Sequence, residues 1–159
     1  MAKPLVVILM GSKGDLEHCQ RIGEACESYG LEAVMRIGSV HKTPGHVADL
    51  LKEYEADPRP KVYITVAGRS NALSGFTDGA VSAPVIACPP SSDAFGGADL
   101  FSSLRMPSGI APAVVLEPSN AALLAAKILG LVDARVRKAV AGSRERAAEK
   151  IIQDDRGMQ

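Results

Sequence analysis

The chain alternates short apolar runs with segments whose apolar residues recur every three or four positions. Residues Leu5–Met10 form an uninterrupted apolar run, which is typical of a strand covered on both faces in a parallel sheet. Four further runs predict strands, namely Glu32–Ile37, Lys61–Val66, Pro84–Cys88 and Ala113–Leu116. Strands that alternate with helices predict an α/β fold, a three-layer open sandwich on a mostly parallel sheet of about five strands.

The intervening segments carry helical periodicity. One apolar stripe runs from Leu16 to Tyr29 and ends at Gly30, a residue typical of helix C-termini. A second stripe runs from Val47 to Tyr54 after Thr43-Pro44, where the hydroxyl is expected to cap the helix and the proline ring already has helical φ. A weaker helix is predicted over Leu73–Val81.

The last third of the chain predicts two more helices. Ala121–Leu129 is apolar at every position except Lys127, so we expect a helix buried on all sides, most simply against another subunit. Residues 133–156 are rich in charge but keep an apolar stripe, which predicts a C-terminal helix. A length of 159 residues indicates a single domain over 1–159, with a core over about 5–131 and the added helix at 133–156.

Composition narrows the classes of partner. The 18 basic residues balance 18 acidic ones, so net charge gives no reason to expect a nucleic-acid or membrane partner. The three cysteines form an odd set without CxxC spacing, which argues against a disulfide framework and a metal site and favours the reducing cytoplasm. Leu5–Met10 is too short for a signal segment or a membrane span.

Open parallel sheets bind ligands beyond the carboxyl ends of their strands. The segments at those ends are polar or rich in glycine: Gly11–Asp15, Ser39–Pro44, Ala67–Gly75 and Cys88–Pro90. His41 and Lys42 stand just before a helix N-terminus, which suits an anionic substrate. The simpler interpretation of the same two residues is a satisfied loop histidine and a solvated lysine.

The first and third of these loops suit a nucleotide. Gly11-Ser12 allows close approach of the backbone to an anion, and Asp15 is placed to accept hydrogen bonds from ribose, although Ser12 and Asp15 are also common helix caps. The pattern is neither GxGxxG nor a Walker loop, so a monophosphate is favoured over a dinucleotide or a triphosphate. Gly68–Asn71 predicts a second backbone cradle with a hydroxyl, an amide and a guanidinium, although Arg69 also fits a plain surface charge.

Three other reactive side chains receive structural interpretations. Cys88 is predicted to be a buried strand residue and not a nucleophile, because nothing near it in sequence would lower its pKa. His18 and His46 fall on predicted helices among solvated residues, so both are predicted to be surface side chains.

Taken together, these segments resemble the phosphoribosylaminoimidazole carboxylase family of purine biosynthesis. The resemblance runs from about Val6 to Leu131 and leaves the C-terminal helix uncovered. It is carried by Gly11-Ser12 with Asp15, Ser39–Pro44, Ala67–Leu73, Cys88–Pro90, Ser102–Gly109 and Asn120–Ala126, in this order.

The family has two branches, and this chain resembles one of them. The mutase branch carries His-Arg where this chain has His41-Lys42, and a second histidine where it has Ala72. The branch that uses free carbon dioxide carries His-Lys and Ala-Gly-Arg-Ser-Asn, as found here from Ala67. One departure is Val40, where the family usually has alanine.

The resemblance implies the activity, the site and the assembly. It implies carboxylation of 5-aminoimidazole ribonucleotide by carbon dioxide without ATP, biotin, metal or any other cofactor, in a flavodoxin-like fold assembled as a homo-octamer. It implies His41 as the proton relay, with the nucleotide or its carboxylate bound by Ser12, Asp15, Ser39, Lys42, Gly68 and Ser70. The alternatives are a carboxyaminoimidazole ribonucleotide mutase and a non-catalytic nucleotide-binding module of flavodoxin type.

Overall fold

A computed structural model of the chain describes residues 2–158 and contains one five-stranded sheet with the order β2-β1-β3-β4-β5. All four neighbouring pairs are parallel, which confirms the predicted sheet. The strands are β1 (Leu5–Met10), β2 (Glu32–Ile37), β3 (Lys61–Val66), β4 (Val85–Ala87) and β5 (Ala113–Val114). The first three match their predicted bounds, and β4 and β5 are shorter than predicted.

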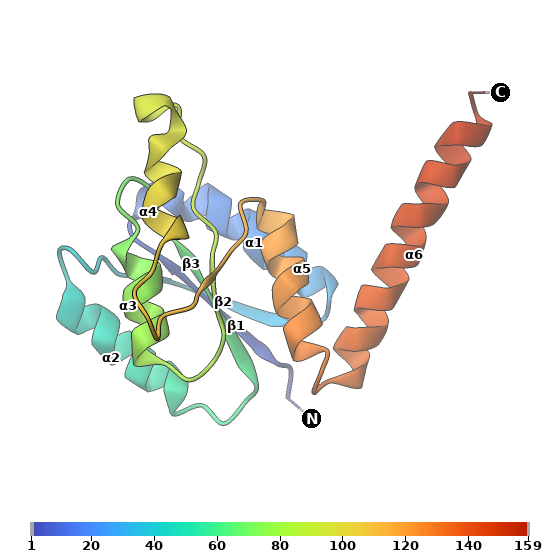
Figure 1. Cartoon of the computed structure of the whole chain (residues 1–159). Coiled ribbons are helices and arrows are strands. Elements are labelled where there is room, and N and C mark those ends of the chain that lie inside the picture. The colour runs from blue at the N-terminus through green and yellow to red at the C-terminus, as the bar shows by residue number, and fades with distance from the viewer. Residues whose placement is uncertain (1, 159) are drawn as a thin grey trace.

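Helices cover both faces of this sheet. The helices are α1 (Leu16–Ser28), α2 (Pro44–Glu55), α3 (Ala72–Ala80), α4 (Phe101–Leu104), α5 (Pro118–Leu129) and α6 (Ala134–Arg156), with 3₁₀ helices η1 (Lys13–Asp15) and η2 (Ala94–Leu100). In Figure 1, α1 and α5 lie on one side of the sheet, and α2 and α3 lie on the other. This arrangement confirms the three-layer, flavodoxin-like sandwich.

Strand β1 is the centre of the core. Because successive side chains of a strand point to opposite faces, Val6, Ile8 and Met10 pack under α1 and α5. Leu5, Val7 and Leu9 pack under α2 and α3. Every residue of the strand is buried, as expected for a strand with parallel neighbours on both sides.

The small-residue face of α5 is buried within its own chain. Ala121, Ala122, Ala125 and Ala126 are completely buried in the core beneath α1 and α5. Lys127 on the opposite side is exposed. The expectation that another subunit must cover this helix is therefore wrong for its alanine face, because side chains of the same chain already cover it.

Helix α6 projects away from the rest of the chain (Figure 1). Asp133 caps its first turn by accepting hydrogen bonds from the backbone N–H groups of Arg135 and Val136. Val136 is buried and Val140 is half-buried against the core, whereas residues 144–158 are exposed. Among residues 2–158, no helix is both long and apolar enough to cross a membrane.

A buried glycine joins β2 to the loop that follows it. The Gly38 N–H donates to the carbonyl of Met10 at 2.9 Å, so the backbone here is held against β1. A Cβ atom at Gly38 would lie 2.7 Å from Cγ2 of Val47, a fully buried residue of α2. Glycine is thus required here because the first turns of α2 pack directly on the chain.

We expect Gly38→Ala to lower the free energy of unfolding by about 1–3 kcal/mol, since Val47 is β-branched and cannot rotate away cheaply. Gly45→Ala is the matched control, because a Cβ there meets no atom within 4 Å and alanine is the better helix former. Urea unfolding of the two variants measures the difference. Equal stability would contradict the tight packing at Gly38.

Candidate active site

Backbone hydrogen bonds hold the loops after four strands along one edge of the sheet. Gly38 is bonded to the end of β1 as described, and the Gly11 N–H donates to Val66 O of β3 at 3.0 Å. The Cys88 N–H donates to Thr65 O at 2.8 Å. The loops that carry the predicted site residues therefore leave the sheet side by side, although they are far apart in sequence.

The loop after β2 is closed by its own polar groups. Ser39 O accepts from the Thr43 N–H at 2.6 Å and from the Thr43 hydroxyl at 3.1 Å, and Thr43 Oγ1 accepts from the Ser39 N–H at 3.1 Å. The Lys42 N–H donates to Ser39 O at 3.2 Å and to its Oγ at 3.3 Å. The expectation that the Thr43 hydroxyl caps α2 is wrong, because this hydroxyl closes the loop instead.

The N-terminus of α2 therefore has no side-chain cap. The first amides of a helix have no partner within the helix, and Pro44 at the first position carries no N–H. The next two amides belong to Gly45 and His46, and they stand beside the loop of His41 and Lys42. Uncapped amides at a positive helix end suit a phosphate or a carboxylate.

The loop after β1 shows a similar absence of caps. Ser12 and Asp15 occupy the N-cap positions of η1 and α1, but neither side chain makes a cap hydrogen bond. Instead, Ser12 Oγ lies 3.4 Å from Asp15 Oδ2. The alternative that these residues serve as helix caps is therefore not supported, and both remain available to a ligand.

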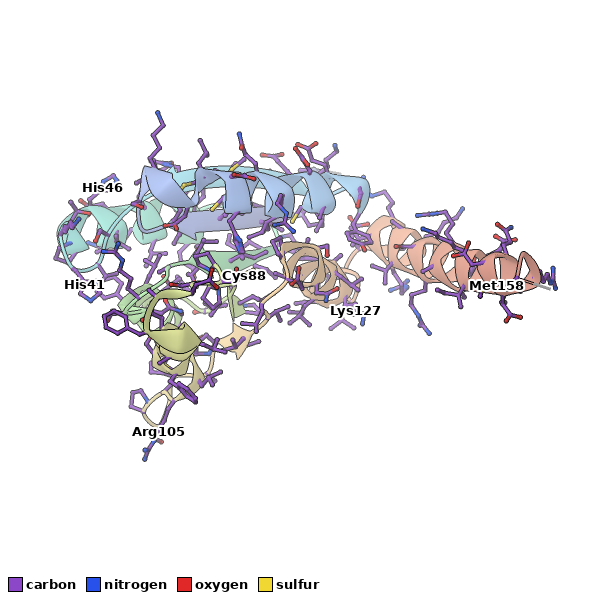
Figure 2. All side chains as sticks on the ribbon, turned by 90° about the horizontal axis from the view of Figure 1, so that it is seen from above. His41, His46, Cys88, Arg105, Lys127 and Met158 are labelled. Carbon is purple, nitrogen blue, oxygen red and sulfur yellow. The ribbon has the colours of Figure 1, made fainter. Side chains whose placement is uncertain are left out.

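The His41 and Lys42 side chains are exposed, and within residues 2–158 neither has a hydrogen-bonding or ionic partner. Figure 2 shows His41 at the end of the molecule where α2 begins, separate from Cys88. His46, one turn further on, is also exposed as predicted, with Nε2 3.1 Å from Ile37 O. The interpretation of His41 as a satisfied loop histidine thus lacks the partner that it would need.

The loop after β3 contains a strained residue. Arg69 has a φ of 56°, in the left-handed region that non-glycine residues avoid. Ser102 Oγ accepts from the Asn71 N–H at 3.0 Å and lies 3.3 Å from the Arg69 carbonyl oxygen, and its nearest acceptor is Asp99 O at 2.8 Å. These bonds hold the turn so that half-buried Gly68 and exposed Ser70 lie at the same sheet edge.

Asn71 has a structural role that the sequence did not predict. Its side chain is buried, with Oδ1 accepting from the Ser74 N–H at 3.2 Å as the cap of α3. Its Nδ2 donates to Ser103 Oγ at 2.8 Å. The predicted amide ligand is therefore committed to protein contacts.

Cys88 is completely buried, one residue beyond β4, as predicted. Burial raises the pKa of its thiol to about 12, so it remains protonated and unreactive near neutral pH.

Among residues 2–158, no group of three or more histidine, cysteine or acidic side chains is arranged to hold a metal ion.

The prediction for His18 is wrong, because this side chain is half-buried. Its Nε2 lies 3.1 Å from Cys88 O and 3.3 Å from Cys88 Sγ. Burial lowers the pKa of His18, with a smaller opposing effect of the bond to the Cys88 carbonyl. The two residues are 70 positions apart, so no local pattern signals the contact.

A cavity of about 290 Å³ lies beside this contact. Its walls include His18 and Arg21 of α1, Gly68, Pro90 and Glu117. Because Gly68 is part of its wall, the cavity adjoins the loop after β3, one of the predicted nucleotide-binding loops.

Comparisons with known proteins identify the family of the chain. Residues 5–150 match the family model described as AIR carboxylase. A phosphoribosylaminoimidazole carboxylase of Treponema denticola is 60% identical over 153 residues, 96% of each chain. Another, from Archaeoglobus fulgidus, is 54% identical over 149 residues, 94% of this chain and 82% of the relative.

A solved structure gives the same result for the fold. The crystal structure of Treponema denticola PurE superposes with a TM-score of 0.97 at 58% identity, covering 99% of both chains. The matched residues include all strands and the loops at their carboxyl ends. The chain therefore belongs to the AIR carboxylase family of enzymes.

Proposed function

We propose that the enzyme carboxylates 5-aminoimidazole ribonucleotide with carbon dioxide to give 4-carboxy-5-aminoimidazole ribonucleotide in purine biosynthesis, without ATP or biotin. One observation carries the proposal: an exposed, unpartnered His41 imidazole stands beside an uncapped helix N-terminus within the described residues. Membership of the AIR carboxylase family supports the same substrate.

The chemistry needs two steps at one ring carbon. The amino group makes the imidazole ring enamine-like, so its C4 attacks the carbon of carbon dioxide and forms a C–C bond. C4 then carries both a hydrogen and the new carboxylate. His41 removes that proton, and the C–H electron pair returns to the ring and restores its aromaticity.

Two effects are available to lower the activation barrier. Holding the two reactants in contact can supply about 7–11 kcal/mol of the barrier, and a positioned acid–base group adds roughly 10²–10⁴-fold. Histidine suits the second role because its charge state changes near neutral pH.

The remaining residues are proposed to hold the nucleotide. We assign the phosphate to the α2 amides and to the loop of Ser39 and Lys42, since an anion is favoured at an uncapped helix end. Ser12 and Asp15 suit the ribose hydroxyls. Gly68 and Ser70 offer the ring or its carboxylate a close backbone approach and a hydroxyl.

The nearest rival is the mutase of the same family, which would move a carboxylate from the amino nitrogen to the ring. Lys42 in place of arginine and Ala72 in place of a second histidine favour the branch that uses free carbon dioxide. The ammonium of lysine is a compact charge, whereas arginine presents a planar fork, so the two suit different anion geometries.

A non-catalytic nucleotide-binding module is the rival from another class. It would use the same fold and sheet edge without turnover. The family, which is named for an enzyme activity, disfavours this rival.

We also propose that the enzyme assembles from several copies, with an octamer as the family resemblance implies. Large apolar side chains are exposed on and near η2 and α4, where Phe95 is 87% exposed and Phe101 is 72% exposed. Exposed apolar groups of this size commonly mark protein interfaces. Light scattering tests the proposal, and a monomeric mass would contradict it.

His41→Asn is expected to lower kcat by at least about 100-fold while nucleotide affinity stays within a few-fold, because the amide keeps polarity but cannot relay a proton. Steady-state kinetics and calorimetric titration measure the two effects. His46→Asn, an exposed histidine in the first turn of α2, is the matched control and should keep wild-type turnover. Near wild-type activity in His41→Asn would exclude the acid–base role.

The branch assignment predicts substrate preference. Turnover of unmodified 5-aminoimidazole ribonucleotide should rise with dissolved carbon dioxide, and the N-carboxylated isomer should be a poor substrate. Lys42→Arg should impair the enzyme without converting it, because the loop from Ala67 is unchanged. An assay at fixed bicarbonate compares the two substrates, and faster use of the carbamate isomer would identify a mutase.

A further inference from the structure

His18 connects helix α1 to the chain that follows β4. Its Nε2 lies 3.1 Å from Cys88 O, and a carbonyl oxygen only accepts hydrogen bonds, so this nitrogen carries the hydrogen. The Cys88 thiol is then left to donate to Leu116 O at the longer distance of 3.6 Å. The bond thus joins α1 to the segment that begins at Cys88, 70 residues later in the chain.

The segment held by His18 continues from Cys88 into two prolines. Pro89 and Pro90 carry no N–H groups, so they cannot donate backbone hydrogen bonds to a neighbouring strand. The Cys88 N–H is bonded to Thr65 O, which fixes the amide side of that residue. The carbonyl side, where the chain turns into the two prolines, is fixed by His18.

The end of this segment lies against a proposed nucleotide loop. Gly68 and Pro90 line the same cavity, and a Cβ atom added at Gly68 would lie 3.5 Å from Pro90 Cγ, so the proline ring occupies the space beside this glycine. Gly68 immediately precedes Arg69, whose left-handed φ makes the turn costly to hold. Because the Pro90 ring occupies the space beside Gly68, its position limits where the turn can lie.

We propose that His18 is a positioning residue for the carboxylation, acting through Cys88 and Pro90 on the Gly68 turn. The inference rests on the proposed function of Gly68 as a nucleotide contact. The His18 ring itself is committed to Cys88. Its effect should fall on binding of the nucleotide in ground state and transition state alike, and so on KM more than on kcat.

Two substitutions separate positioning from simple packing. His18→Leu removes the donor and keeps an apolar side chain, whereas His18→Gln keeps an N–H donor near the position of Nε2. We expect His18→Leu to raise KM and the dissociation constant for 5-aminoimidazole ribonucleotide about tenfold with kcat within threefold. His18→Gln should restore both binding constants to within about twofold of wild type.

Controls keep the outcome decisive. Gln20→Leu, an exposed change on the same helix, should leave binding unchanged. If His18→Leu does not fold, His18→Asn replaces it, because its shorter side chain places the donor too far from Cys88 O. Unchanged binding in a folded His18→Leu or His18→Asn, or equal loss in His18→Gln, would overturn the proposal.

Calorimetric titration distinguishes this failure from failure of the proposed function. A wild-type enzyme that binds the nucleotide without carboxylating it would refute the function and still allow the binding ratios of the His18 variants to be read. A wild-type enzyme that turns over normally, with binding insensitive to His18, would refute only the positioning role.

Discussion

The parallel pairing of β1 with both β2 and β3 is the constraint on which the site depends. The register is continuous along all six residues on each side, from Leu5 to Met10. Because all three strands point the same way, the loops after them open at the same edge. The burial of β1 on both faces makes this register expensive to change, since a shift by one residue would exchange the two sets of core side chains.

Hydrogen bonds hold the backbone of the loops that carry the exposed reactive side chains at this edge. The His41 loop is closed by Ser39 and Thr43, and Gly38 holds it against β1 and α2. The turn after β3 is held by Ser102 in a conformation that arginine would otherwise avoid. Local hydrogen bonds therefore fix the backbone and leave the His41 and Lys42 side chains to the ligand.

Much of this architecture could be predicted from sequence, because the signals are local. Three elements follow from patterns among neighbouring residues: the apolar run of β1, the helical stripe before Gly30 and the start of α2 at Thr43-Pro44. What the sequence could not predict depends on distant partners. His18 contacts Cys88 across 70 positions, and Asn71 contacts Ser103 across 32. No local pattern signals either contact, so the sequence predicts a surface histidine and an amide ligand instead. The partner that covers α5 is mispredicted for the same reason. Its alanine face packs on α1, a helix that begins about a hundred residues earlier, and not on another subunit.

The most direct test of the account is a crystal structure with 5-aminoimidazole ribonucleotide bound. The phosphate should lie within hydrogen-bonding distance of the first α2 amides and Lys42, with the ring carbon that accepts the carboxylate facing the His41 imidazole. A nucleotide bound instead in the cavity beside His18 and Arg21, without contact to His41, would contradict the central claim.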